Sequence, residues 1–507
     1  MFGELHDEGI NPLFSIRTTS LGVVKRWQLN IDQLPEKVLL EIFDFYRTGM
    51  VNDPSFGSKT SVEAWQVLIH VCQRWRFIVF GSLHYLDLRL CCTPNTPVKG
   101  TLDVWPALPL MIEGDMTLKY NSGMGNILAA LEQSNRICRV SLLHLWGWQL
   151  HKVLAAMQGH FPVLTDLRLS SAGEMPAFGG IPDSFLDGSA LRLRYFSLSG
   201  IPFPGLPNLL LSATQLVSIK LTDVPDSGYI SSEAMVALIS VLTSLKSFSL
   251  EFRSPRSRPD RDRETQHLPP SQRSVLPDLY DFCFKGDTGY LEDLVICIDA
   301  PGLHRLILSF FDQVDFGCPQ LYQFINRTPT FTALEEVHVQ FGYGTASFIH
   351  RHCSSDTYDK DDNLQIYVSC TEPERQLSAI EQVCNSLSRP LSPVEDLFIE
   401  QQYSQMVWEN DVIEKTLWLQ ILLPFTAVRI LHISEELAPG IAAALRGLVG
   451  ARIAEVLPNL KTILVDGFGP SEHFLKNIGQ FAIERELFAP PVSSVSDFDK
   501  NLNMELM

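Results

Sequence analysis

The chain has 507 residues, of which 45% are hydrophobic and 19% charged, and this composition excludes an intrinsically disordered protein. Its length predicts two or more domains or one elongated array. The formal net charge of −18 argues against nucleic acid or an anionic membrane as a partner. The arginine-rich segment 252–270 also contains acids and prolines, so we expect a solvated loop there, with a phosphate or peptide contact as the alternative.

The cysteine pattern and the N-terminal residues predict a reduced, intracellular protein, located in the cytoplasm or the nucleus. The 10 cysteines are scattered without CxxC pairs, and several lie in apolar stretches. Residues 1–30 contain acids and only short apolar runs, so we expect an N-terminal extension rather than a signal peptide. No run of about 18 apolar residues occurs, and we therefore expect no membrane span.

Residues 31–80 predict a small helical module. Pro35 suits the first position of a helix, because the N–H that proline lacks has no partner there. Apolar side chains follow at three- and four-residue spacing until Gly49 and predict one apolar face. A second helix is expected over 61–82, with Ser61 as its N-cap and apolar residues on two sides. So small a core must dock on a neighbour or a partner.

Three short motifs in this module carry a family resemblance. Leu34-Pro35 opens the first helix, Ile42-Phe43 ends its aliphatic run, and VCQRWR occupies 71–76. In this order the motifs resemble the F-box. The resemblance implies that the module binds the Skp-type adaptor of a cullin-containing ubiquitin ligase. The residues that it implies for this contact are Leu34, Pro35, Glu36, Leu39, Ile42, Phe43, Val71, Cys72 and Trp75.

Downstream of the module, segments of the form apolar-x-x-apolar-x-apolar recur. The template alone is weak evidence, because a chain with 45% hydrophobic residues often matches it by chance. The regular spacing of about 29 residues is stronger evidence and lies at the upper end of the range of leucine-rich repeats. The segments begin at Ile137, Leu164, Leu193, Leu216, Leu245, Leu279, Leu303, Leu334, Val394, Val428 and Leu460, with further candidates at Leu83 and Leu364.

Helix-compatible stretches lie between these segments, notably 150–159, 231–242, 375–387 and 439–457. The segment 291–301 matches the strand template but lies close to its neighbours on both sides, so we interpret it as the helix of its repeat. Alternation of strand and helix at a regular period predicts stacked repeats that share one core. The predicted fold class is therefore α/β: the small N-terminal helical F-box, an irregular leucine-rich-repeat-like solenoid over 81–485, and a flexible C-terminal tail over 486–507.

The turns of this array depart from the leucine-rich-repeat pattern. Eight residues after each start, that family prefers Asn or Cys, whereas this chain has Ala172, Ile201, Val224, Arg253 and Phe468. We therefore expect the turns to be satisfied by other groups. In its layout, a helical module followed by a long degenerate array, the chain resembles the large F-box group of mushroom-forming fungi.

No catalytic constellation is found in the sequence. Glycine-rich phosphate loops and the GxSxG and HExxH motifs are absent, so we expect no enzyme, no cofactor and no metal site. The cluster His350, His352 and Cys353 lacks a distant ligand pair with zinc-like spacing, and we expect a surface or loop role for it. The acidic run 356–363 lacks the glycine and glutamate of an EF-hand and is expected to be a solvated insertion.

The strands of the array offer a recognition face, because the residues between their apolar anchors point away from the core. Mixed polar and aromatic side chains on such a face suit protein binding. The residues that we expect to contact a target protein are Arg168, Tyr195, Lys220, Arg305, His338, Phe398 and His432.

These expectations lead to one leading hypothesis and one alternative. The leading hypothesis is a substrate-recognition subunit of a Skp-cullin-F-box type ubiquitin ligase, in which the module docks on the adaptor and the array holds the target. The alternative is a scaffold or sensor that binds protein partners without a ligase. Segment 47–60 supports the alternative, because it is longer than the usual F-box connection and could obstruct docking, although it could also be a harmless surface insertion.

Overall fold

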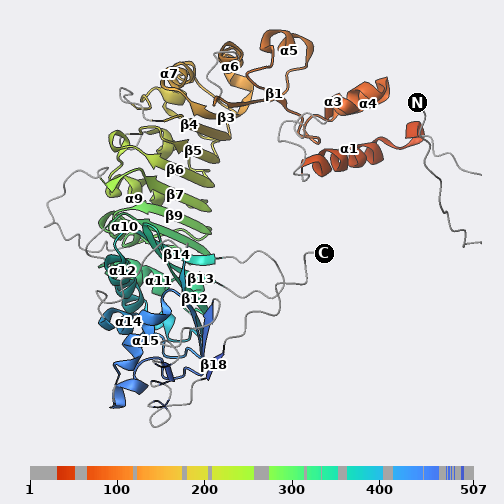
Figure 1. The fold of residues 1–507 in the computed structure, drawn as a ribbon. Helices are drawn as coiled ribbons and strands as arrows, with labels where there is room; N and C mark the ends of the chain where they lie inside the picture. Colours follow the sequence, from red (N-terminus) through yellow and green to blue (C-terminus); the bar gives the residue numbers. More distant parts are fainter. Residues whose placement is uncertain are drawn as a thin grey trace, which may run out of the picture. The chain divides into compact units, whose positions relative to one another are not determined.

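The computed structural model divides the chain into two compact units, Met1–Leu88 and Arg89–Met507 (Figure 1). In the described residues the first unit is helical, and the second is a long sheet with helices along one face. The residues that the structure describes are 31–51, 65–117, 123–173, 180–203, 208–255, 273–312, 317–332, 334–351, 362–402, 415–448, 450–466 and 493–495, with single residues between 476 and 485.

The helical unit contains α1 (Glu36–Val51), α3 (Trp65–Val71) and α4 (Gln73–Gly81), preceded by the 3-10 turn η1 (Ile31–Gln33). The predicted helix start is confirmed within one residue, since the Pro35 carbonyl accepts the Leu39 N–H at 3.1 Å. The apolar pattern of the sequence stops at Gly49, but α1 continues to Val51. A helical glycine costs only about 1 kcal/mol, so Gly49 does not by itself end a helix. Residues 52–60 of the connection lie outside the described residues.

The second predicted helix is in fact two helices, α3 and α4, and the break falls at Cys72. The backbone of Cys72 is extended, with φ −158° and ψ 170°, and its Sγ accepts the Trp75 N–H at 3.4 Å. Cys72 is therefore the N-cap of α4. Across the break, the Arg76 Nε donates to the Ile69 carbonyl at 3.1 Å. The predicted cap at Ser61 lies outside the described residues.

The core of the helical unit is a small aromatic and aliphatic cluster. The rings of Phe43 and Trp75 have centroids 4.7 Å apart, and those of Trp65 and Phe80 are 6.1 Å apart. The other buried side chains of the helices are Leu39, Leu68, Ile69, Ile78 and Val79. A core of this size leaves a unit marginally stable by itself, so the loss of one of its large side chains affects all of it.

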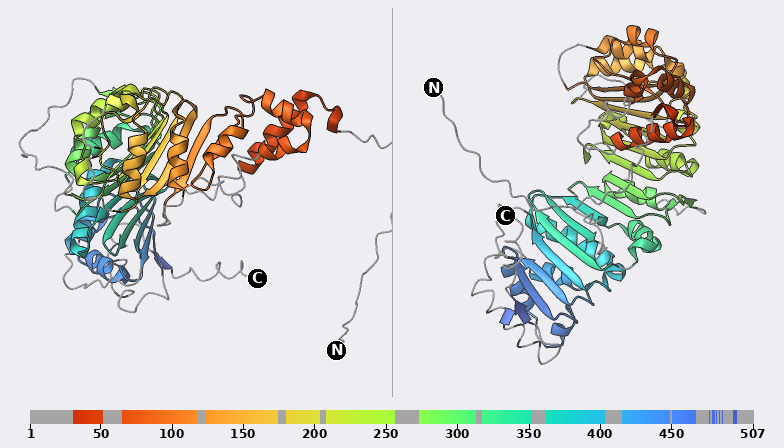
Figure 2. Two further views of the ribbon diagram at one scale, coloured as in Figure 1. Left: turned by 90° about the horizontal axis from the view of Figure 1, so that it is seen from above. Right: turned by 90° about the vertical axis from the view of Figure 1, so that its right-hand side faces the viewer.

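In the described residues, the second unit is built on one large sheet with helices on one side (Figures 1 and 2). Its 16 strands have the order β1-β2-β3-β4-β5-β6-β7-β9-β11-β14-β13-β12-β15-β16-β17-β18. Neighbouring strands are parallel, except that β13 is antiparallel to both β12 and β14. The strands are β1 (Leu90–Cys92), β2 (Leu110–Asp115), β3 (Ile137–Leu145), β4 (Asp166–Ser171), β5 (Tyr195–Ser199), β6 (Ser218–Val224), β7 (Ser247–Phe252), β9 (Asp281–Gly286), β11 (Arg305–Phe310), β12 (Glu336–Gly342), β13 (Thr345–Arg351), β14 (Asp362–Ser369), β15 (Asp396–Gln401), β16 (Ile430–Ser434), β17 (Thr462–Asp466) and β18 (Ser493–Val495).

Helices between the strands lie along one face of this sheet (Figure 1). They are α5 (Val98–Val104), α6 (Met124–Leu131), α7 (Gly147–Ala156), α8 (Asn208–Ser212), α9 (Ser232–Val241), α10 (Thr288–Val295), α11 (Pro319–Arg327), α12 (Pro373–Ser386), α13 (Ser388–Leu391), α14 (Lys415–Leu422) and α15 (Ala438–Arg446). Short 3-10 turns are η2 (Ser134–Arg136), η3 (Phe185–Gly188), η4 (Asp226–Gly228), η6 (Pro329–Phe331) and η7 (Gly450–Ala454), and β8 (Ser274–Val275) and β10 (Ile298–Asp299) form a separate parallel pair. In the part of the chain that is described, no helix is long and apolar enough to cross a membrane.

The predicted helices of the array are confirmed as α7, α9, α12 and α15. The last of these is shorter than expected, because α15 ends at Arg446 and the 3-10 turn η7 follows. The helical interpretation of 291–301 is confirmed by α10 as far as Val295, while Ile298–Asp299 beyond it form β10.

Aligned apolar side chains form continuous rows on the helix side of the sheet. One such row consists of register partners on β4 to β9, all of them almost fully buried: Leu167, Phe196, Ile219, Phe248 and Phe282. The rings of Phe248 and Phe282 have centroids 5.4 Å apart. A single repeat cannot bury such a row, and each strand is covered only when its neighbours stack on it. The described repeats therefore form one leucine-rich-repeat-like core.

Most predicted repeat starts are confirmed by a strand that begins two residues later, because the first apolar anchor lies in the preceding turn. The candidate at Leu83 is wrong, since residues 82–87 form turns and the first strand is β1. The first two strands, β1 and β2, were not expected. The predicted flexible tail is wrong at Ser493–Val495, which form β18 and pair with β17.

The region after Leu334 differs most from the predicted repeat. Leu364 was expected to start a repeat between its sequence neighbours, and a strand, β14, is indeed found there. The sheet order is nevertheless β11-β14-β13-β12-β15, so β14 pairs with β11, and β12 pairs with β15. The three strands form an antiparallel meander whose order in the sheet is the reverse of its order in the chain.

The turns after the strands are satisfied by neighbouring repeats, as expected for a chain without the usual asparagine. The Ala172 N–H donates to the Leu145 carbonyl at 2.8 Å, and the Arg253 N–H donates to the Val224 carbonyl at 2.9 Å. Left-handed backbone bends the chain at His144, Gly200 and Asp223, each of which lies one residue before a turn position: Leu145, Ile201 and Val224. Phe468 lies outside the described residues.

The Asp223 turn shows how a non-glycine residue is held in left-handed backbone. The φ angle of Asp223 is 53°. The guanidinium of Arg253 donates two hydrogen bonds to its carboxylate, from Nε to Oδ1 at 2.9 Å and from Nη2 to Oδ2 at 2.7 Å. A side chain on Gly200 would lie 3.3 Å from the Arg253 Nη2, so glycine there leaves room for the pair.

Candidate protein-binding surfaces

The F-box-like motif residues lie together in the helical unit, and several of them build its fold. The Arg74 Nη2 donates to the Leu34 carbonyl at 2.5 Å, which ties α4 to the residue before Pro35. Phe43 and Trp75 meet in the core, as described above. The motif therefore encodes the way in which α1 and α4 are joined.

The predicted adaptor-contact residues divide by exposure. Leu39, Phe43 and Trp75 were predicted to contact the adaptor. They are instead buried and form part of the core of the helical unit. Leu34 and Cys72 are half-buried. The exposed members are Pro35, Glu36, Ile42 and Val71.

An exposed apolar stripe lies on α1, and only one of its members, Ile42, was a predicted contact residue. Val38, Ile42 and Phe45 follow the i, i+4, i+7 spacing of one helix face, and their exposed fractions are 41%, 41% and 79%. On the other helices the exposed apolar residues are Val67, Val71 and Phe77. Side chains of this size are rarely exposed together unless a partner covers them.

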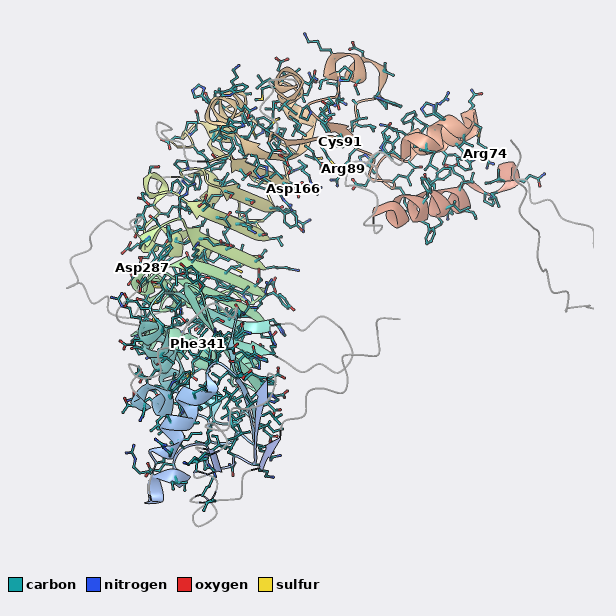
Figure 3. All side chains as sticks on the ribbon, viewed as in Figure 1. Arg74, Arg89, Cys91, Asp166, Asp287 and Phe341 are labelled. Carbon is teal, nitrogen blue, oxygen red and sulfur yellow. The ribbon has the colours of Figure 1, made fainter. Side chains whose placement is uncertain are left out.

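The second candidate surface is the face of the sheet opposite the helices. Figure 3 shows Asp166 on the strands, whereas Asp287 lies on the helix side, where its Oδ1 caps α10 by accepting the Tyr290 N–H at 2.9 Å. The strand register places one row of outward-facing side chains across the sheet, here called the central row. It runs through Arg168, Ser197, Lys220, Ser249, Cys283, Ile307, Gln365, Ile349, His338, Phe398 and His432.

The central row contains most of the predicted target-contact residues but separates them into two groups. Arg168 and Lys220 lie on β4 and β6, while His338, Phe398 and His432 lie on β12, β15 and β16. Tyr195 and Arg305 belong to the adjacent row, where Arg305 is aligned with Asp281 and forms an ion pair with it at 3.7 Å. The reversed meander inserts β14 and β13 between the two groups.

Three stacked rings mark the second group. His338 and Phe398 have ring centroids 4.2 Å apart with an interplanar angle of 5°, and Phe398 and His432 are 3.9 Å apart at 12°. His338 is only 3% exposed, although it lies on the outward side of the sheet. The three stacked rings, here called the aromatic ridge, run across β12, β15 and β16.

Charged groups surround His338. Its Nε2 lies 2.6 Å from a carboxylate oxygen of Glu336, and its Nδ1 lies 3.4 Å from one of Glu400. The Arg351 Nη1 approaches the same ring at 3.2 Å. The hydrogen bond with His338 is the main cause that lowers the pKa of Glu400. Burial raises the pKa of Asp396, on the neighbouring strand β15.

Sequence reasoning missed two of these partners. Arg351 comes from β13, a strand that carries no repeat spacing, and Glu400 is the last outward position of β15. In residues 348–351 the side chains alternate between the core and the outward face, with Ile349 and Arg351 outward. This alternation is the local signal that could have predicted β13.

The described residues show no group of His, Cys, Asp and Glu side chains that could hold a metal ion. The expected surface role of His350 is wrong, because it is 2% exposed and its register partners are Val337 and Leu364 of the core. His352, Cys353 and most of 356–363 lie outside the described residues. In the central row, burial raises the pKa of the Cys283 thiol to about 12, so the thiol stays protonated at neutral pH.

Comparison with known proteins adds little to this geometry. No family model matches the chain, and no curated protein matches it. Among solved structures, a leucine-rich repeat-containing protein, LegL7 from Legionella pneumophila, is similar over 78% of this chain and 97% of its own length, with 13% identity and a TM-score of 0.27. The repeat architecture described above rests on the strand order and register, because a TM-score this low carries no argument.

Proposed function

We propose that the chain is a substrate-recognition subunit of a Skp-cullin-F-box type ubiquitin ligase. In this proposal the helical unit binds the adaptor and the outward face of the sheet binds a target protein. The exposed stripe Val38, Ile42 and Phe45 carries the proposal, since it lies beside motif residues that resemble the F-box. All covalent chemistry would belong to other subunits, and this chain would supply proximity and orientation.

Two contacts support the first half of the proposal. The motif residues hold α1 and α4 together through the contacts Arg74–Leu34 and Phe43–Trp75. A unit fixed in this way presents its remaining apolar side chains on a preformed surface, which lowers the entropic cost of binding.

The test is co-purification with a Skp-type adaptor. Phe45→Asp should weaken adaptor binding by at least about tenfold, because it replaces the most exposed apolar side chain of the stripe by a charge. Phe45 is 79% exposed, so the variant should remain folded. The matched control is Tyr343→Asp, since Tyr343 is 84% exposed but lies in the repeat unit.

Two results would count against this proposal. If the unaltered chain binds no Skp-type adaptor, the alternative of a protein-binding scaffold without a ligase gains support. If Phe45→Asp and Tyr343→Asp both bind the adaptor as the unaltered chain does, the exposed stripe of α1 is not the docking surface.

A further inference from the structure

Four cations lie on, or directly before, neighbouring strands of the sheet without a carboxylate partner. Arg168 and Lys220 occupy the central row on β4 and β6. Arg194 and Lys246 directly precede β5 and β7. All four are exposed. In the described part of the chain none of them forms an ion pair, whereas the nearby Arg139 is paired with Asp166 at 3.4 Å and Arg305 with Asp281. We call this group the basic strip.

The basic strip is unusual in a chain with a formal charge of −18. Between its cations the outward side chains of Ser197 and Ser218 carry hydroxyl groups, whereas the hydroxyl of Ser249 already donates to Glu251 Oε1 at 3.1 Å. Hydroxyl groups donate hydrogen bonds to carboxylate oxygens, and the side chains of Arg and Lys donate charge-assisted hydrogen bonds to them. The one outward aromatic ring among the described residues of β4 to β7 is Tyr195, so the strip lacks the series of stacking platforms that single-stranded nucleic acid uses.

The spacing of the cations suggests the conformation of a ligand. Arg168 and Lys220 are two strands apart, with Ser197 between them in register. Two strand spacings amount to about 9.6 Å. In a polyproline II segment every third side chain returns to the same side after about 9.3 Å. A peptide in this conformation, crossing the strands, would place acids three residues apart opposite Arg168 and Lys220.

We infer that the basic strip binds an extended acidic segment of the target protein, with Asp or Glu at every third position. This inference rests on the proposed function of the sheet face and names the chemistry of its ligand. The aromatic ridge on β12 to β16 is not part of this site, because its carboxylates Glu336 and Glu400 are already engaged with His338.

The test uses the full chain and a fluorescent peptide of about twelve residues with Glu at every third position and Pro and Ser between. Fluorescence anisotropy should show binding that weakens as salt is added. The double variant Arg168→Glu, Lys220→Glu should bind at least about tenfold more weakly. The matched control is Lys152→Glu, Arg389→Glu, which makes the same change in net charge on two exposed helical residues and should bind within about twofold of the unaltered chain.

Three outcomes would overturn the inference: no binding of the peptide by the unaltered chain, an equal loss in the control variant, or equal binding of a peptide with the same residues but contiguous glutamates. Tighter binding of a single-stranded oligonucleotide of equal charge would also overturn it in favour of nucleic acid. Adaptor binding is measured on the same samples. If the adaptor binds and the peptide does not, the acidic-segment inference fails while the proposed adaptor contact stands.

Discussion

The helical unit and the repeat unit use their identifying residues in the same way. In the helical unit, the F-box-like residues Phe43 and Trp75 are buried and join two helices, while the less diagnostic Phe45 is exposed. In the repeat unit, the apolar residues of the repeat template are buried in rows, and the residues between them face outward. The comparison teaches that a motif identifies the scaffold, and that the side chains between motif positions determine what the scaffold can bind.

The two units should differ most in their response to the loss of a core ring. Phe43→Ala removes the contact with Trp75 and should cost about 3 to 5 kcal/mol. Because the helical unit is small, this loss should unfold it and abolish the proposed adaptor binding, while the repeat unit remains folded. Hydrogen exchange resolved by segment checks this, with fast exchange expected in α1, α3 and α4 only.

The corresponding change in the repeat unit is Phe282→Ala, which removes a fully buried ring from the row between β7 and β11. It should destabilise the array by a similar amount but leave exchange in α1 unchanged. Faster exchange in both units with either variant would contradict their independence.

The turns of the repeat unit provide a smaller test. Asp223→Ala removes the ion pair with Arg253 and places alanine, which tolerates left-handed backbone less well than aspartate, at a φ of 53°, so it should destabilise the chain by about 1 to 2 kcal/mol. Asp223→Gly removes the same pair but relieves the backbone strain, and it should therefore be closer to neutral. Urea unfolding of both variants checks this, and an equal loss in the two would show that the backbone is not strained.

The smallest expected effects depend on pH and come from two carboxylates beside the aromatic ridge, Glu400 and Asp396. The pKa of Glu400 is below its usual 4.5, so its stabilising contribution is present above that pH and is lost as the pH falls through the folded value. Glu400→Gln should therefore be less stable than the unaltered chain at neutral pH, by less than about 1 kcal/mol, with the difference fading in acid.

The contribution of Asp396 to stability should depend on pH in the opposite direction. Its pKa is above its usual 3.8, so the unfolded chain binds fewer protons and stability falls as the pH rises from that value through the folded one. Asp396→Asn should thus gain stability relative to the unaltered chain as the pH rises. Urea midpoints across this range check both variants, and parallel pH profiles would contradict the assigned burial and contacts.

Much of the fold could be predicted because local patterns determine it. Repeat starts such as Leu193 and Leu245 precede observed strands, since a buried anchor must recur wherever a repeat stacks on its neighbour. The break between α3 and α4 at Cys72 could not be predicted, because the apolar pattern of 65–81 fits one continuous helix as well as two. Only the capping geometry of its Sγ distinguishes them.

The reversed meander could not be predicted for a different reason. Its strands were partly visible, but the pairing of β14 with β11 depends on contacts between segments far apart in the chain. The spacing of the repeat starts predicts that a repeat exists, but it does not predict the order in which the strands pair. The same limit applies to the binding surfaces, because Arg351 reaches His338 only through that pairing.

The most direct test of the division between the two units is a hydrogen-exchange footprint of the full chain with a Skp-type adaptor. Slower exchange should be confined to α1, α3 and α4, around Phe45 and Phe77, with the strands from β4 to β16 unchanged. Protection of the strands without protection of these helices, or no protection at all, would contradict the account.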